Sequence, residues 1–509
     1  MNKQMLTPVF IISAIVVTIL VIIGAINPSG FGAVATQLFN FTTINFGWFY
    51  LLSVFMFVLF LAALAISKYG KIRLGPPDSR PEYPFFTWIG MLFSAGFGAG
   101  LVFWGVAEPM SHYFKTPFQG LEGQTDEAAR VAMGYAFFHW GISQWSVFAI
   151  VGMMIAFLQF RKNKNGLVST AVEPVLGKNK TVKTIIDSLA VIATVMGIAT
   201  SLGLGILQMN GGLKAVFDVP NSITIQLIIT FCLLVLYLLS SSSGLNKGIK
   251  WLSNINLGLC LVLLAFVFIA GPTVFILNGF TLGIGDYITN FVQYSLRLTP
   301  YEGGDWLREW TIFYWAWVIA WSPFVGAFVA RVSRGRTIRE FIFGVLVVPP
   351  AIACLWIATF GGTALNSDLN HGTKIAEAVN NDVTVALFET YSHLPMTGIM
   401  SLLSILLIAT FLITSADSAT YILASMTSNG DLTPALPIKI IWGVLMAAIA
   451  AVLLVAGGLN ALQTASLVSA LPFTVIIIIF VYAFTKIIRQ EPVPERRLKS
   501  ERDKQKRSS

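Results

Sequence analysis

Charged residues are scarce in this chain. Asp, Glu, Lys and Arg make up 11% of the 509 residues, whereas hydrophobic residues make up 56% and the mean hydropathy is +0.76. This composition excludes a water-soluble globular fold and is typical of a helical protein that crosses a membrane many times. Counting domains by length, which suits soluble chains, therefore does not apply.

Cysteine is rarer still. The three cysteines, Cys232, Cys260 and Cys354, lie far apart in apolar segments. We expect them to be small buried hydrophobic side chains and not a disulfide or a metal site. Metal-ligand spacings, a nucleophile elbow and a phosphate-binding loop are missing too, which argues against an enzyme.

Long apolar runs are abundant, and twelve of them can span a bilayer as helices. They cover about residues 8–26, 46–66, 85–106, 130–158, 183–212, 222–241, 251–279, 308–331, 338–364, 396–424, 434–456 and 459–487. Asn27-Pro28 follows the first run in place of a small-residue cleavage site, so an uncleaved first helix fits better than a signal peptide.

The loop charges alternate along the chain. The loops after the second, fourth, sixth and eighth runs are basic, with Lys68, Lys71, Arg73, Arg161, Lys162, Lys164, Lys247, Lys250, Arg331, Arg334, Arg336 and Arg339. The opposite loops carry Glu122, Asp126, Glu127, Asp286, Glu302, Asp305, Asp368 and Asp382. Because basic loops stay in the cytoplasm, both termini are expected there. The charged tail from Arg489 onward is either a solvated topology signal or a helix that contacts anionic lipid.

Four tryptophans stand within twelve residues of segment 310–321, and Ser322-Pro323 follows directly. Aromatic faces attract cations, most strongly where water is excluded. A Trp-lined helix that breaks inside the membrane therefore indicates a site for an organic cation. The alternative is an interfacial aromatic belt with ordinary packing.

A second interruption is expected where Gly96, Gly98 and Gly100 alternate, because each glycine costs a helix about 1 kcal/mol relative to alanine. The two interrupted helices are five apart, as in transporters built from inverted repeats. We predict an N-terminal helix pair (1–84), a first repeat (85–280), a second repeat (281–488) and a basic cytoplasmic tail (489–509).

Polar residues within the apolar runs give three further hypotheses. His139 has no carboxylate at helical spacing, so we interpret it as a hydrogen-bonded structural residue and not a proton carrier. Thr414 and Ser415 suit a small hard cation, although hydroxyls also bond back to their own helix. Asp417 lies near the cytoplasmic end, and an ion and a structural partner such as a loop arginine are equally compatible with it.

The chain resembles the betaine/choline/carnitine transporters, and within them the glycine betaine systems of Gram-positive bacteria, from about Pro8 to the twelfth run. The resemblance rests on the Gly-rich third run followed by Trp104-Gly-Val-Ala-Glu108-Pro109, Phe138-His-Trp140, the 197–205 and 310–324 segments, the basic 330–341 loop, and Thr414-Ser415-Ala-Asp417-Ser418. It implies an all-α polytopic fold of twelve transmembrane helices, with two N-terminal helices before a 5+5 inverted-repeat sodium-symporter core. It also implies a possible homotrimer in the bacterial plasma membrane and no nucleic-acid partner.

The same resemblance implies the site residues. The substrate would contact Trp140, Trp145, Phe148, Trp317, Val318 and Trp321, with the backbone of Gly96, Gly98 and Gly100 beside its carboxylate. One sodium ion would lie among Ser94, Phe97, Phe411, Thr414 and Ser415, and a second between Thr194 and Phe324. No other cofactor is expected.

Three positions depart from the family pattern. Val318 stands where a second adjacent Trp is usual, Phe148 where Tyr is common, and Ser143 where His is frequent. A missing ring weakens cation–π attraction by up to about 2 kcal/mol in a dry site.

The predicted function is sodium-coupled uptake of glycine betaine or a related compatible solute for osmoprotection, by alternating access. The alternatives are another substrate (choline, carnitine, ectoine, proline or a sulfonate), an osmosensor or receptor that moves no solute, and, less consistent with a dry aromatic box, a channel.

Overall fold

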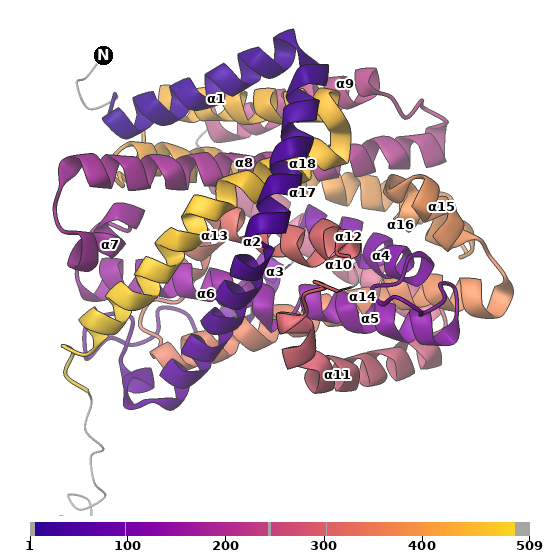
Figure 1. Ribbon diagram of the computed structural model, residues 1–509, viewed down its shortest axis with the longest axis horizontal. Helices are drawn as coiled ribbons and strands as arrows, with labels where there is room; N and C mark the ends of the chain where they lie inside the picture. Colours follow the sequence, from indigo (N-terminus) through magenta and orange to yellow (C-terminus); the bar gives the residue numbers. More distant parts are fainter. Residues whose placement is uncertain (1–5, 97, 243–245, 302, 494–509) are drawn as a thin grey trace, which may run out of the picture.

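The computed structural model describes residues 6–96, 98–242, 246–301 and 303–493, with all their side chains except those of 93–96 and 246–251. This part of the chain is a bundle of long helices without a β-strand (Figure 1). One antiparallel bridge, between Arg73 and Thr337, joins two of its loops.

Each predicted apolar run lies mostly in helix, although several helix bounds differ from those of the runs. The long helices are α1 (Pro8–Ile26), α2 (Pro28–Ile66), α3 (Phe85–Gly96), α4 (Ala99–Phe114), α5 (Asp126–His139), α6 (Ile142–Ala156), α8 (Lys180–Phe217), α9 (Ile223–Ser242), α10 (Asn246–Ala270), α11 (Thr273–Leu296), α13 (Phe313–Val332), α14 (Ile338–His371), α17 (Thr397–Thr427) and α18 (Leu436–Ile488). The shorter ones are α7 (Val168–Leu176), α12 (Asp305–Leu307), α15 (Ile375–Asn381) and α16 (Ala386–Ser392), with π-helical turns at Phe157–Arg161 and Arg308–Ile312 and 3-10 turns at Lys68–Lys71 and Val383–Val385.

Twelve crossings can be counted in the described residues. Ten helices are long and apolar enough to span a membrane, and α18, which has 53 residues, is one of them. Because α18 is two helices joined at Gly458, it makes two crossings. The interrupted pair α3 and α4 supplies the twelfth crossing. The prediction of an all-α polytopic fold is confirmed.

The turn inside α18 depends on one glycine. Gly458 has φ 55° and ψ −129°, a conformation that side-chain-bearing residues rarely adopt. Figure 1 shows the yellow helix turning back on itself there, so that its second arm crosses the bundle diagonally beside α2.

The predicted break at Ser322-Pro323 is wrong. The helix α13 runs through Pro323 from Phe313 to Val332. Proline has no N–H, so the Ile319 carbonyl four residues earlier loses its usual donor. The Ser322 hydroxyl donates to that carbonyl at 2.8 Å, which replaces the lost bond and lets the helix continue. The irregular part of this span lies earlier, at the π-helical turn.

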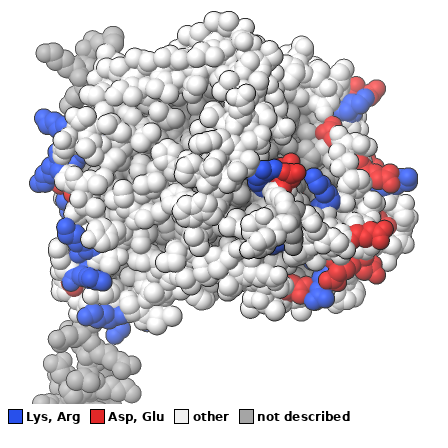
Figure 2. All heavy atoms as spheres, viewed as in Figure 1, with Lys and Arg blue, Asp and Glu red and all other residues white. Residues whose placement is uncertain are grey.

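Charged side chains gather at the two ends of the bundle. Figure 2 shows basic residues along the edge where α1 begins and α18 ends, mixed acidic and basic residues at the opposite edge, and a mostly uncharged surface between them. Three of the predicted basic loops meet at the first edge. Arg73 donates to the Gly335 carbonyl, and Arg161 donates to the Gly75 carbonyl. Lys247 and Lys250, of the fourth loop, are outside the described side chains.

The end of α18 is held at this basic edge. The carboxylate of Glu491 accepts from Arg161 Nε at 2.5 Å and also pairs with Lys162. Burial raises the pKa of Glu491, but the hydrogen bonds from Lys162 and Arg161 outweigh burial and leave the pKa below its ordinary value. The contact is therefore present at neutral pH and lost as the pH falls through that lowered pKa. Residues 494–509, with most of the predicted lipid-binding tail, lie outside the described residues.

The seventh apolar run, one predicted repeat boundary and one cysteine differ in the structure from what the sequence predicts. The apolar run 251–279 is not one helix, because α10 ends at Ala270 and a separate helix, α11, follows. The predicted boundary between residues 280 and 281 consequently falls inside α11. Cys260 and Cys354 are buried as expected, but Cys232 is exposed on α9, where lipid would surround it.

Replacing Gly458 with alanine should destabilise the protein by about 1–3 kcal/mol, because the added Cβ strains the backbone at this turn. Gly279→Ala in α11 is the matched control: a Cβ at either glycine meets no atom within 4 Å, but only Gly458 has a positive φ. Thermal unfolding of the detergent-solubilised protein measures both. Equal melting temperatures for the two variants would contradict the assigned strain.

Candidate functional site

The first component of the site is the interruption between α3 and α4. The helix α3 ends at Gly96, Gly98 is extended with φ −167° and ψ 170°, and α4 begins at Ala99. The N-cap glycine has no side chain to bond the first N–H groups of α4, so the positive end of this helix faces the gap. The predicted interruption is confirmed. Phe97 and the Ser94 side chain lie outside the described part of the chain.

Gly100 lies where two indoles close on α4. A Cβ at this position would be 2.7 Å from Cη2 of Trp317 and 3.5 Å from Cη2 of Trp140. Any larger residue would displace the Trp317 ring. Three of the predicted site residues, from three different crossings, therefore meet at one point.

A second interruption, which the sequence analysis missed, divides the fourth crossing. The helix α5 ends at His139 and α6 begins at Ile142, with Trp140 as the C-cap of α5 (φ −92°, ψ 3°). In an unbroken helix, Trp140 and Trp145 would point to different sides. Because of the break, the direction of the Trp140 side chain is not fixed relative to that of Trp145 by regular helix geometry.

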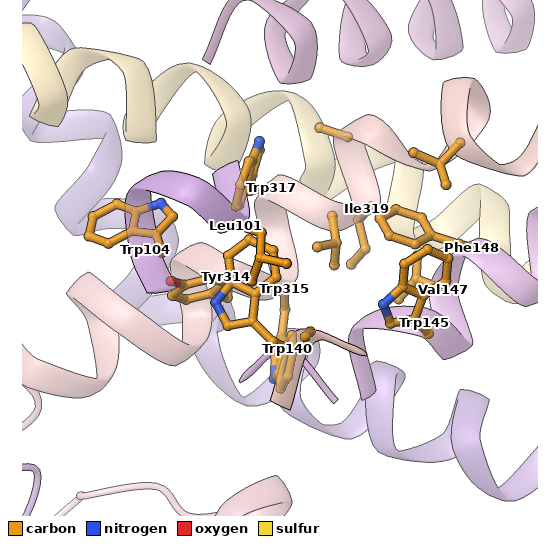
Figure 3. Packing of buried hydrophobic residues seen from close by; sticks show 14 of the residues in the cluster. Leu101, Trp104, Trp140, Trp145, Val147, Phe148, Tyr314, Trp315, Trp317 and Ile319 are labelled. Atoms are coloured by element: carbon orange, nitrogen blue, oxygen red, sulfur yellow. The ribbon is translucent and has the colours of Figure 1, made fainter. Parts of the chain in front are cut away.

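Five predicted site residues form a continuous row of rings, which we call the aromatic row. From Trp140 to Trp317, Trp321, Phe148 and Trp145, successive ring centroids are 6.2, 6.1, 5.9 and 5.2 Å apart. Trp317 and Trp321 are nearly parallel, at 14°, and the other pairs meet edge to face. Figure 3 shows the two ends of the row, with Trp140 and Trp317 at one and Trp145 and Phe148 at the other. Only Trp321 is more than slightly exposed.

Val318 is buried on α13, one position after Trp317 and three before Trp321. It follows Trp315 by three residues and so shares its side of the helix. Trp315 packs edge-on against Phe138 of α5, with centroids 5.3 Å apart. Val318 thus lies between Trp315 and Trp321 on the surface of α13, which packs against α6.

A buried carboxylate supports one end of the row. Oε2 of Glu108, on α4, accepts from Trp140 Nε1 at 2.9 Å and from the Tyr314 hydroxyl at 2.5 Å. Oε1 lies 2.6 Å from His139 Nδ1 and 3.3 Å from His112 Nε2. Glu108 and both histidines have no exposed surface.

Four donors match the acceptor capacity of an ionised carboxylate, which has about four lone-pair sites and no proton to give. This network stabilises a charge that would otherwise be very unfavourable inside a membrane. His139 is hydrogen-bonded, as predicted, but its partner is a carboxylate from another crossing.

Glu108, His112 and His139 place ligand atoms within 4.8 Å of one another, which raises the question of a metal ion. The hydrogen bonds argue against one. Trp306 Nε1 lies 3.2 Å from His112 Nδ1, and an indole N–H can only donate. His112 Nδ1 therefore accepts, and its Nε2 carries the proton that it gives to Glu108. A metal ion bound at Nε2 would require the remaining ring proton on Nδ1, where it would face the Trp306 N–H, so this arrangement fits a hydrogen-bonded network better than a metal centre.

Three of the five residues predicted for the first sodium ion, Phe411, Thr414 and Ser415, lie on α17. The Thr414 hydroxyl donates to the carbonyls of Thr410 and Phe411 at 2.9 and 3.1 Å. Its oxygen keeps a lone pair available to a cation. Ser415 is partly buried beside it, and α17 packs against α4.

The residues predicted for the second ion lie at a close crossing of α8 and α13. A Cβ at Gly197 would be 3.0 Å from Trp321 N, so the two backbones nearly touch. Thr194 precedes Gly197 by three residues and Phe324 follows Trp321 by three. Because α8 and α13 are the fifth and eighth crossings and run in opposite directions, this places Thr194 and Phe324 at the same depth.

Asp417 has a structural partner in another helix. Ser240 of α9 donates to its Oδ2 at 2.6 Å, so the partner is a serine and not the suggested loop arginine.

Sequence reasoning did not assign a role to Glu108, Tyr314 or Gly141. Glu108 had a signal: it is a carboxylate within an apolar run with His112 four residues later, and charged residues at membrane depth are usually paired or functional. Tyr314 had no distinct signal among its neighbouring aromatic residues. Gly141 was a weak indication of the second interruption.

The sequence of the chain is similar to those of known membrane transporters. The family model described as BCCT, betaine/carnitine/choline family transporter, matches residues 8–493. The chain is 70% identical to the ectoine/hydroxyectoine transporter of Virgibacillus pantothenticus, over 96% of this chain and 98% of that protein. It is 47% identical to the glycine betaine transporter OpuD of Bacillus subtilis, over 96% and 95%, and 44% identical to a probable glycine betaine transporter of Desulfitobacterium hafniense, over 96% and 99%.

Glu108→Gln should weaken solute binding about tenfold or more, because the new amide group points a donor at groups that already donate and so leaves buried donors unpaired. Glu309→Gln, an exposed carboxylate of the π-helical turn, is the control. Solute affinity of the purified variants, read from tryptophan fluorescence, is the measurement. Unchanged affinity in Glu108→Gln would show that the carboxylate does not support the row.

Proposed function

Because the chain belongs to the betaine/carnitine/choline transporter family, we propose that it is a secondary active transporter for a zwitterionic compatible solute, with ectoine or hydroxyectoine as its principal substrate. It is a multi-pass membrane protein and not an enzyme, as its relatives are named as transporters. The aromatic row is the observation that carries the proposal, since it offers buried rings from two crossings to an organic cation.

The composition of the row favours ectoine over glycine betaine. A trimethylammonium group is bulky and gains most from rings on several sides. An amidinium spreads its charge over a flat N–C–N group, which one indole face can attract. Because Val318 stands where the family pattern has a tryptophan, the site lacks a ring that would attract a trimethylammonium group more than an amidinium. The 70% identity to a protein named as an ectoine/hydroxyectoine transporter supports the same choice, whereas the sequence analysis placed glycine betaine first.

The carboxylate of the solute would lie at the gap between α3 and α4. The N-terminus of α4 is positive there, and a Cβ at Gly98 would meet no described atom within 4 Å, so a ligand can approach the backbone at this glycine. The cationic end would then point toward Trp140 and Trp317, which close on Gly100.

Sodium would drive the transport. A tenfold sodium gradient supplies about 1.4 kcal/mol, and 100 mV adds about 2.3 kcal/mol per charge. One ion then supports roughly 500-fold accumulation of a neutral zwitterion, and two ions support about 10⁵-fold. An osmolyte taken from a dilute medium favours two ions, which is compatible with the two predicted sites.

The basic edge of the bundle would face the cytoplasm, since basic loops remain inside. Both termini would then be cytoplasmic, in the plasma membrane of a bacterium. A homotrimer and contact of the tail with anionic lipid remain predictions.

Val318→Trp should shift preference toward glycine betaine by up to about 30-fold relative to ectoine, the equivalent of about 2 kcal/mol of cation–π attraction. Val318→Leu, which adds volume without a π face, should not. Competition of each solute against labelled ectoine in reconstituted vesicles gives the ratio. If both variants keep the wild-type ratio, Val318 does not face the solute.

Thr414→Ala should raise the sodium concentration for half-maximal uptake about tenfold, because an oxygen ligand is lost. Thr230→Ala is the control, since that buried threonine of α9 makes the same back-bond to the residue four positions earlier. Uptake is measured in vesicles over a sodium series. Uptake that proceeds undiminished without sodium would refute the coupling, and absence of flux in a protein that binds solute would favour a sensor.

A further inference from the structure

The helix α11 is not among the ten described helices that are long and apolar enough to span a membrane, and it is docked closely against α5. The Asp286 carboxylate accepts two bonds from the Arg130 guanidinium, both 2.8 Å, in a fork-like pair. Tyr294 stacks on Tyr135 with centroids 4.0 Å apart. These contacts fix the position of α11 along the helix that leads to Trp140.

The break between α5 and α6 exposes backbone N–H groups at the start of α6 that no side chain of the break itself can cap. A helix begins with N–H groups that lack partners within the helix, and a side chain of the N-cap residue usually bonds one of them. The N-cap of α6 is Gly141, which has no side chain. Because the break lies inside the membrane, water is not freely available to replace the cap.

Tyr287 of α11 supplies the missing cap from another helix. Its hydroxyl accepts the N–H of Ile142, the first residue of α6, at 2.8 Å. Tyr287 is buried, and a Cβ on Gly141 would lie only 2.3 Å from the hydroxyl oxygen. Gly141 therefore both opens the helix and leaves space for the tyrosine that closes its end.

The capped end lies between two rings of the aromatic row. Trp140 immediately precedes Gly141, and Trp145 follows Ile142 by three residues. Glu108 holds Trp140 through its indole N–H, but none of its described bonds reaches α6. The bond to Tyr287 therefore acts at the start of α6, three residues before Trp145 and six before Phe148.

We propose that Tyr287 is a positioning residue for the solute site and that α11 caps α6 in trans. The cap itself follows from the contacts above. Its effect on solute affinity rests on the proposed function, because it requires that the aromatic row binds the solute.

Tyr287→Phe tests the proposal, since it removes the hydroxyl and keeps the ring. We expect faster amide hydrogen exchange in the 140–146 segment of the solute-free protein. We also expect the dissociation constant and KM for ectoine to rise about tenfold, with a smaller change in maximal uptake rate, because an unpaired buried donor loosens the row. Glycine betaine is measured in parallel.

Tyr237→Phe is the matched control. Tyr237 is also buried, and its hydroxyl donates to the Gly443 carbonyl between α9 and α18, away from the row. A role limited to general stability predicts that both variants lower the amount of folded protein and leave KM unchanged. That result, or unchanged exchange in the 140–146 segment of Tyr287→Phe, would overturn the proposal.

The two arms separate the proposal from the proposed function. Hydrogen exchange needs no solute, so it reports on the cap even if the wild-type protein binds neither ectoine nor glycine betaine. In that case the substrate assignment fails, and accelerated exchange in Tyr287→Phe still supports the cap. If the wild-type protein binds ectoine, and Tyr287→Phe shows accelerated exchange with an unchanged affinity for ectoine, then the cap does not serve the site.

Discussion

The requirement that backbone polar groups find partners inside a bilayer governs this structure more than any single contact. The chain departs from regular helix at several points at membrane depth, and each departure is treated differently. At Pro323, the preceding serine supplies the missing donor, and the helix continues. At Gly141, a tyrosine from a different helix supplies an acceptor, and the helix bends. At Gly98, the N-cap has no side chain to offer, and no described side chain caps the start of α4.

This contrast supports the proposal that the anionic end of the solute lies at the gap at Gly98. A break that is capped by the protein is a hinge or a change of direction, whereas an uncapped helix N-terminus attracts an anion. The rings of Trp140 and Trp317 close on Gly100, immediately beyond the gap. Positive helix end and aromatic faces therefore lie next to each other, as a zwitterion requires.

The Glu108 network connects electrostatics to packing in the same region. A carboxylate at membrane depth is tolerated because four donors surround it, and one of these donors is a ring of the aromatic row. The hydrogen bond also orients that indole. A charged group that would be destabilising alone thus contributes to the rigidity of the site, as buried polar networks do when every member is satisfied.

The fold class, the twelve crossings, the interruption at Gly96–Gly100 and all five residues of the aromatic row could be predicted from the sequence. These follow from run length, glycine spacing and short motifs, which act over one helix or less. The tertiary structure decided the rest. Ser322-Pro323 reads as a helix breaker, but a single side-chain bond of 2.8 Å reverses that outcome. Glu108 and His139 are 31 residues apart, and Ile142 and Tyr287 are 145 apart, so their hydrogen bonds exist only once the helices have packed. A periodic sequence pattern predicts which face of a helix is apolar. It does not predict which polar atom, distant in sequence, will form the hydrogen bond that an interrupted helix lacks.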